Sequence, residues 1–154
     1  LKIGNKAPRF SLPTDSGETF SLDELRGQKV VLYFYPKNMT PGCTSEALDF
    51  REHTKDFNNA GTSIIGVSKE TIMRHKNFKT KYNLDFTLVS DEEGKLCEAY
   101  GVWKKKKLYG REFMGIERTT FLIDSVGVIQ KIWSKVKIKG HAQEVLAAVQ
   151  SCPH

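Results

Sequence analysis

The chain has 154 residues, of which 39% are apolar, and this suits one globular domain over residues 1–154 with a sizeable core. No stretch approaches the roughly 18 uninterrupted apolar residues of a membrane span, and the first residues lack the apolar centre of a secretory signal. We therefore expect a cytoplasmic protein without a membrane partner. The formal net charge of +6 could attract an acidic partner, but no nucleic-acid-binding module accompanies it, so we predict no nucleic-acid partner.

The cysteines indicate a reducing compartment. Cys43, Cys97 and Cys152 are odd in number and widely spaced, which argues against a disulfide framework. The histidines are scattered and lack the paired spacing that a zinc site requires. We therefore expect neither a metal nor a cofactor.

The first elements in chain order form a scaffold. Residues 10–12 and 18–20 are strand-like and flank the turn sequence Asp15-Ser16-Gly17, which predicts an N-terminal β-hairpin. Residues 21–25 follow as a single helical turn.

The next stretch predicts a central strand that leads into a helix. Residues 30–35 are apolar on both faces, as in a strand covered by helices, and Pro36 ends the run. Thr40 is a good N-cap whose hydroxyl can accept a bond from a helix N–H, and Pro41 fits the first helical position. We predict one helix from there to Gly61.

Cys43 falls at about the third position of this helix. The partial positive charge and unpaired N–H groups of a helix N-terminus stabilise a thiolate. We therefore interpret Cys43 as an exposed nucleophile without apolar neighbours, rather than as a small buried hydrophobe, which is the more common role of a lone cysteine.

Strands and helices alternate in the second half of the chain. Residues 63–68 and 86–89 are strand-like, and residues 69–82 and 95–100 are helical. This succession predicts a parallel sheet with right-handed crossovers. Periodicity is lost over residues 103–115, a basic segment that we predict to be a mobile loop.

The last elements complete a mixed sheet. Residues 119–124 and 128–133 predict an antiparallel hairpin, and residues 141–150 a final helix packed on the sheet. The expected fold class is therefore α/β, with a central mixed sheet flanked by helices in the manner of a thioredoxin fold.

The site motif resembles a known family. Pro36, Thr40 and Cys43 stand at the P-x-x-x-T-x-x-C spacing of peroxiredoxins, and the surrounding sequence Y-F-Y-P-K-N-M-T-P-G-C-T-S-E-A resembles the peroxiredoxin Q, or bacterioferritin comigratory protein, branch. The resemblance continues through S-L-P-T-D-S-G near the start and R-T-T-F-L-I-D near the end. It implies a thioredoxin-like fold and a monomeric thiol peroxidase that reduces hydrogen peroxide and alkyl hydroperoxides.

The resemblance also implies a role for each site residue. Cys43 attacks the peroxide and becomes a sulfenic acid, Thr40 bonds the peroxide and the sulfur, and Pro36 shields the site from water. Arg118 matches the arginine that peroxiredoxins bring from a distant strand. Glu46 matches the C-T-x-E pattern of the branch, but we treat it as secondary because a first-turn glutamate also favours the helix dipole.

The resolving cysteine is where the sequence departs from the branch. Many members place it five residues after the reactive cysteine, where this chain has Leu48, and others place it in the segment equivalent to residues 69–82, which contains none here. We expect Cys97 to be buried and Cys152 to lie on a loose chain end. The prediction is a one-cysteine cycle that is completed by thioredoxin or another thiol, with both cysteines as less favoured resolving candidates.

Two other functions compete with a peroxidase. A dithiol-disulfide oxidoreductase would carry Cys-x-x-Cys at this junction, and Thr40 in place of the first cysteine disfavours it. A non-enzymatic thioredoxin-fold binding module could use the basic segment around Lys104.

Overall fold

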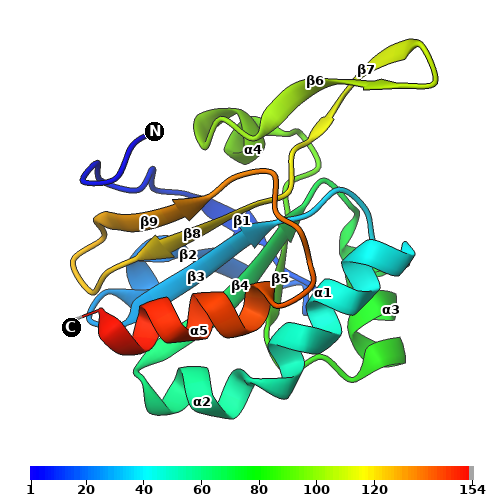
Figure 1. Cartoon of the computed structure of the whole chain (residues 1–154). Coiled ribbons are helices and arrows are strands. Elements are labelled where there is room, and N and C mark those ends of the chain that lie inside the picture. The colour runs from blue at the N-terminus through cyan, green and yellow to red at the C-terminus, as the bar shows by residue number, and fades with distance from the viewer. Residues whose placement is uncertain (153–154) are drawn as a thin grey trace.

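A mixed β-sheet forms the centre of the computed structural model, which describes residues 1–152 (Figure 1). Over these residues the central sheet has five strands in the order β5-β4-β3-β8-β9. Their bounds are β3 Lys29–Phe34, β4 Thr62–Ser68, β5 Thr87–Ser90, β8 Thr119–Ile123 and β9 Ile129–Trp133. β3, β4 and β5 are parallel, whereas β8 pairs antiparallel with both β3 and β9. This confirms the predicted mixed sheet and its final hairpin.

The N-terminal hairpin is also confirmed. β1 (Ser11–Pro13) and β2 (Thr19–Ser21) pair antiparallel, and the short 3-10 helix η1 (Leu22–Leu25) follows directly. The Ser21 N–H donates to the Glu24 carboxylate at 2.6 Å, which fixes the start of η1.

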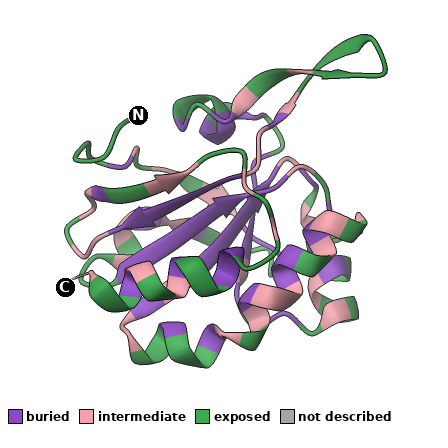
Figure 2. Cartoon of the chain, in the orientation of Figure 1, coloured by how far each residue is buried: buried purple, intermediate pink, exposed green. Residues whose placement is uncertain are grey.

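Strand β3 divides the apolar core between the two faces of the sheet. Successive side chains of a strand point to opposite faces. Accordingly, Val30, Leu32 and Phe34 belong to one buried cluster, and Val31, Tyr33 and Tyr35 belong to the other. All six residues of β3 are buried, as predicted (Figure 2).

Helices cover the sheet and connect its strands. They are α1 Pro41–Glu52, α2 Thr54–Asn59, α3 Ile72–Tyr82, α4 Lys95–Ala99 and α5 His141–Ser151. None of the helices within residues 1–152 is both long enough and apolar enough to cross a membrane.

The prediction of one continuous helix up to Gly61 is wrong. The chain leaves helical geometry at His53, where φ is −107° and ψ is 4°, so α1 and α2 are separate. The Thr54 hydroxyl donates to the Phe50 carbonyl at 3.2 Å and to the Asp85 carboxylate at 2.8 Å. Such back-bonding by threonine bends helices, and it explains the break.

The prediction of a mobile loop over residues 103–115 is also wrong. β6 (Trp103–Leu108) and β7 (Arg111–Ile116) form an antiparallel hairpin that projects from the body of the molecule (Figure 1). Tyr109 and Gly110 turn it with φ values of 51° and 76°, as a tight hairpin turn requires. Both faces of the hairpin are largely exposed, so its sequence lacks the apolar and polar alternation that reveals a half-buried strand.

Candidate active site

The site lies where β3 ends and α1 begins. Tyr35 still bonds to the sheet through its N–H, which donates to the Val67 carbonyl at 3.1 Å. After a short loop, Thr40 has extended backbone angles and Pro41 takes the first helical position. Cys43 is therefore the third residue of α1, as the sequence predicts.

The Thr40 side chain does not cap the helix, and this part of the prediction is wrong. Its hydroxyl instead donates to the Lys37 carbonyl at 2.9 Å and closes the loop on itself. The Thr40 carbonyl accepts the Thr44 N–H at 2.9 Å, so the backbone still begins the helix in the ordinary way.

Strand pairing brings Arg118 to Cys43. Phe34 at the end of β3 pairs with Thr119 at the start of β8, and Arg118 immediately precedes Thr119. Its Nη2 atom lies 3.2 Å from the Cys43 Sγ, across a separation of 75 residues in the sequence. The other arm, Nη1, donates to Glu46 Oε1 at 2.6 Å. The structure thus brings Cys43, Glu46 and Arg118 together.

Burial sets the charge state of the Arg118–Glu46 pair. Burial alone would lower the pKa of Arg118, but Glu46 and Cys43 outweigh it, and the pKa is raised. Burial raises the pKa of Glu46 to about 7, against the opposing effect of Arg118. Among the described residues, Glu46 Oε2 has no hydrogen-bond partner. The carboxyl of Glu46 therefore changes charge near neutral pH, while the guanidinium stays positive.

The expectation of an exposed Cys43 thiol is wrong. Its side chain belongs to a buried cluster with Tyr35 and Ala47, and only 2% of the residue is exposed. A distant part of the chain contributes to its surroundings, because the Arg118 guanidinium lies against the sulfur. In this conformation the sulfur is shielded from bulk water.

Pro36 and Thr40 lie in the loop that leads to the sulfur. Pro36 is half-buried, and its carbonyl accepts the Ser68 hydroxyl at 3.3 Å. Pro36 bonds to Ser68 and the Thr40 side chain bonds to Lys37, rather than either bonding to the sulfur of Cys43. The structure therefore places both residues close to Cys43 along the chain without bonding them to its sulfur.

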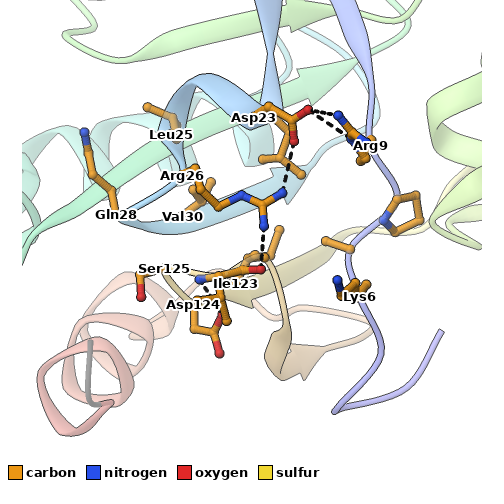
Figure 3. Close-up of a pocket in the computed structure, with 15 residues that line it drawn as sticks. Lys6, Arg9, Asp23, Leu25, Arg26, Gln28, Val30, Ile123, Asp124 and Ser125 are labelled. Atoms are coloured by element: carbon orange, nitrogen blue, oxygen red, sulfur yellow. Dashed lines mark hydrogen bonds and ion pairs between the residues drawn. The ribbon is translucent and has the colours of Figure 1, made fainter.

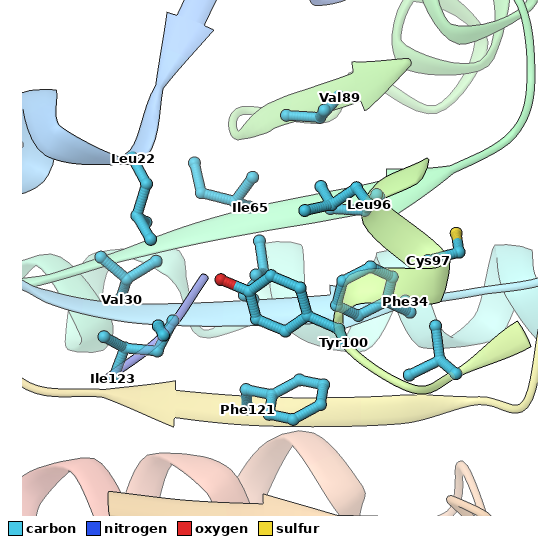
Figure 4. Packing of buried hydrophobic residues seen from close by; sticks show 14 of the residues in the cluster. Leu22, Val30, Phe34, Ile65, Val89, Leu96, Cys97, Tyr100, Phe121 and Ile123 are labelled. Carbon is cyan, nitrogen blue, oxygen red and sulfur yellow. The ribbon is translucent and has the colours of Figure 1, made fainter. Parts of the chain in front are cut away.

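Cys97 is on the opposite face of the sheet from Cys43. It is 0% exposed, in the cluster that contains Leu96 and Phe34, and the prediction of its burial is confirmed (Figure 4). Burial raises the pKa of its thiol well above the ordinary value, and the neighbouring Asp91 raises it further. The sheet itself separates the two sulfur atoms.

Cys152 lies at the other end of the sheet. The prediction of a loose chain end is wrong for this residue, because it is half-buried and its carbonyl accepts the Lys29 ammonium at 2.9 Å. Lys29 begins β3, whereas Cys43 follows the end of β3. A strand of this length spans about 20 Å, which places Cys152 far from Cys43.

A pocket of about 400 Å³ lies away from the site, at the end of the sheet where β3 begins (Figure 3). Its charged side chains are paired with one another: Asp23 bonds to Arg9, and also to Arg26 at 3.2 Å. Arg26 further donates to the Val126 carbonyl at 2.8 Å. None of the residues that line this pocket belongs to the group of Cys43, Glu46 and Arg118.

Sequence reasoning missed two groups near the site. Tyr35, Asn38 and His75 form a buried polar network below the loop, although nothing in their spacing marks them as neighbours. Lys106 on β6 is half-buried, and burial together with the Arg118 charge lowers its pKa. Only the three-dimensional arrangement reveals either group.

The sequence matches one protein family along most of its length. The AhpC/TSA family matches residues 3–132. A putative peroxiredoxin Bcp from Coxiella burnetii is 53% identical over 146 residues, covering 95% of this chain and 97% of that protein. Peroxiredoxin Bcp of Bacillus subtilis is 51% identical over 150 residues, covering 97% and 96%.

Solved structures agree with these relatives. The bacterioferritin comigratory protein of Xanthomonas campestris, studied for its alkyl peroxide reduction activity, has a TM-score of 0.88 at 43% identity and covers 92% of this chain and 90% of that one. A cysteine-to-serine mutant of PrxQ from Xylella fastidiosa has a TM-score of 0.93 at 35% identity, covering 98% and 96%. The predicted thioredoxin-like fold is thereby confirmed, and the chain belongs to the AhpC/TSA family, in its peroxiredoxin Q branch of thiol peroxidases.

Proposed function

We propose that this peroxidase reduces hydrogen peroxide and alkyl hydroperoxides at Cys43, in a one-cysteine cycle completed by thioredoxin or a low-molecular-weight thiol. The Cys43 thiolate attacks the terminal peroxide oxygen, the O–O bond breaks, and a sulfenic acid forms. The departing oxygen takes up a proton and leaves as water or an alcohol. The contact of 3.2 Å between Arg118 Nη2 and Cys43 Sγ carries this proposal.

Arg118 stabilises the negative charge on the Cys43 sulfur before the reaction and on the departing oxygen as the O–O bond breaks. Its guanidinium lies beside the sulfur that begins negative, and it remains beside the oxygen that receives the charge as the O–O bond breaks. A planar fork of N–H donors suits these two acceptors at once. Glu46 holds the fork in place through the bond of 2.6 Å to Nη1, so we assign it a positioning role.

Thr40 and Pro36 complete the site in this proposal. The Thr40 hydroxyl already donates its hydrogen to the Lys37 carbonyl, so its oxygen is left to accept. A peroxide O–H can donate to that oxygen, which keeps the proton on the atom that Cys43 attacks. Pro36 has no N–H to attract water, and it shields the same space.

The one-cysteine cycle is supported by the positions of the other two sulfur atoms. Cys97 is buried on the far face of the sheet, and Cys152 lies beside Lys29 at its opposite end. Leu48 occupies the position where many relatives carry their partner cysteine. An external thiol therefore condenses with the sulfenic acid and releases water, and a second thiol then releases Cys43 as the thiol.

The proposal extends to setting and assembly. A cycle that consumes thiols suits a reducing cytoplasm, and the resemblance to the peroxiredoxin Q branch suggests a monomer. Sedimentation of the reduced and oxidised protein tests the second statement, and a dimer in either state would contradict it.

Intact mass after one equivalent of hydrogen peroxide tests the whole cycle. We expect one added oxygen on Cys43, trapped with a sulfenic acid reagent, in the wild type and equally in the matched controls Cys97→Ala and Cys152→Ser. Cys43→Ser should consume no peroxide. An intramolecular disulfide that contains Cys43 would exclude the one-cysteine cycle while leaving the peroxidase assignment intact.

A further inference from the structure

A buried polar network lies beneath the loop of residues 36–40. The Tyr35 hydroxyl donates to Asn38 Oδ1 at 2.7 Å, and Asn38 Nδ2 lies 3.0 Å from His75 Nδ1. On its other side, His75 Nε2 lies 2.9 Å from the Val89 carbonyl. Tyr35 is 1% exposed, Asn38 5% and His75 0%, so water does not supply alternative partners.

The Val89 carbonyl fixes the direction of the bonds that join His75, Asn38 and Tyr35. The Tyr35 hydroxyl oxygen also lies 3.3 Å from His75 Nδ1. A carbonyl only accepts, so His75 Nε2 must carry the hydrogen, and Nδ1 of the neutral ring is then an acceptor. Asn38 Nδ2 donates to it, which turns Asn38 Oδ1 toward the Tyr35 hydroxyl. A protonated His75 would present an N–H to the Asn38 amide N–H groups, and this bond would be lost.

The same asparagine anchors the loop backbone. The Asn38 N–H donates to Glu70 Oε1 at 3.1 Å, and the Pro36 carbonyl accepts the Ser68 hydroxyl at 3.3 Å. The next residue, Met39, has a φ of 65°, in the left-handed region that a non-glycine residue adopts under constraint. Such a conformation persists where the surroundings hold it.

We propose that Tyr35, Asn38 and His75 are positioning residues of the peroxide reaction, which hold the loop of residues 36–40 so that Thr40 and Cys43 meet the substrate, and which do so with His75 neutral. This inference rests on the proposed function of Cys43. Asn38 precedes Thr40 by two residues and Cys43 by five, so a shift of the Asn38 side chain moves the start of α1 directly. Arg118 approaches from the other side and does not take part in this network.

The surroundings of His75 keep its ring neutral. Burial lowers the pKa of His75, although the carboxylates of Glu70 and Asp15 oppose this effect. Both carboxylates are engaged elsewhere: Glu70 pairs with Arg74 at 3.2 Å, and Asp15 pairs with Lys79 at 2.9 Å. The pKa of His75 in the folded state lies below the ordinary value for histidine. The network is therefore intact above the ordinary pKa, and it is lost as the pH falls through the pKa of the folded state.

Tyr35→Phe is the sharpest variant, and Tyr100→Phe is its matched control. Both remove one buried hydroxyl that makes a bond of 2.7 Å, but Tyr100 donates to the Pro8 carbonyl on the other face of the sheet. In single turnover with hydrogen peroxide, we expect Tyr35→Phe to slow the oxidation of Cys43 by roughly fivefold to tenfold, as the loss of one buried hydrogen bond implies. Tyr100→Phe should react at the wild-type rate, whatever it costs in thermal stability.

Asn38→Asp reverses the polarity of the network and gives a second readout. A carboxylate at this position accepts from Tyr35 and favours a protonated His75, so the pKa of His75 should rise. In a plot of the Cys43 oxidation rate against pH, the acid limb is the fall in rate at low pH. We expect this limb to move to higher pH together with the titration of His75, followed by NMR. In the wild type, the acid limb and this titration should coincide.

The outcomes separate this inference from the proposed function. If Tyr35→Phe reacts at the wild-type rate, or if the wild-type acid limb and the His75 titration do not coincide, the positioning role is wrong. The wild-type comparison needs no variant, so it decides the matter even if the substituted proteins fail to fold. Failure of the peroxidase assignment would appear differently, as peroxide consumption that survives Cys43→Ser.

Discussion

Cys43 and Cys97 are equally hidden from water, yet their surroundings favour opposite chemistry. Cys43 is 2% exposed, begins a long helix and has Arg118 at 3.2 Å from its sulfur. Cys97 is 0% exposed, and its backbone N–H donates to Asp91 Oδ2 at 2.9 Å. A cation stabilises a thiolate, whereas burial and a carboxylate favour the neutral thiol. We therefore expect the charge beside a cysteine, more than its exposure, to separate a reactive thiol from an inert one in this chain.

The largest difference between the two cysteines should appear in peroxide consumption when each one is substituted. Cys43→Ser should abolish peroxide consumption, because a hydroxyl is a far weaker nucleophile than a thiolate. Cys97→Ala should retain the full rate and lose stability only through the cavity that it leaves. The rate of hydrogen peroxide loss with an excess of thiol measures both. Substantial loss of activity in Cys97→Ala with an intact fold would break the comparison.

Removal of the cation from the Cys43 side should come next. Arg118→Met should slow the reaction with hydrogen peroxide by about a hundredfold, in line with the loss of one preorganised donor to a charged transition state. Arg118→Lys keeps the charge but not the fork, so it should recover part of this loss. Single-turnover rates at several peroxide concentrations give both values. Equal rates for the lysine and methionine variants would show that the charge itself is unimportant.

Glu46→Gln should have a smaller effect and should reveal itself in the pH dependence. The pKa of Glu46 is raised to about 7 in the fold, so the folded state is most stable when this carboxyl is protonated. The ordinary pKa of a glutamate is 4.5. The free energy of unfolding should therefore fall by up to about 3 kcal/mol as the pH rises from 4.5 toward 7. Glu46→Gln should flatten this decline. Chemical denaturation of the two proteins across this pH range measures it, and parallel curves would contradict the assignment.

The smallest effect concerns the surroundings of Cys97. Asp91→Asn removes the carboxylate that accepts the N–H groups of Leu96 and Cys97 at the start of α4. It should cost about 1 kcal/mol of stability, because the amide has only one oxygen with which to accept the two N–H groups. Cys97 should still not react with hydrogen peroxide, because no guanidinium replaces the carboxylate. Mass analysis after oxidation checks this, and oxidation at Cys97 would mean that the carboxylate alone suppresses its reactivity.

The local parts of the site were predictable from the sequence. Pro36 ends an apolar run, and Thr40-Pro41 begins a helix, so the position of Cys43 in the first turn follows from short-range chemistry. Arg118 could be assigned only through family resemblance, because it lies 75 residues away and the register of β3 on β8 brings it close. The roles assigned to Pro36, Thr40 and Glu46 stay predictions for the experiments above.

The failures of the sequence analysis have physical causes. Cys43 was expected to be exposed because its short-range sequence does not show the tertiary contacts that bury it, such as the one with Arg118. The β6–β7 hairpin was missed because both of its faces are solvated, which removes the alternation that marks a strand. The break at His53 comes with the bond from the Thr54 hydroxyl to the Phe50 carbonyl, which the spacing of apolar residues does not reveal.

The pairing of Phe34 with Thr119 also sets the order in which the parts of the site can come together during synthesis. Arg118, whose guanidinium contacts Cys43, lies 75 residues further along the chain. During synthesis Cys43 is therefore made well before Arg118. Until β8 has left the ribosome and joined β3, that sulfur lacks this partner.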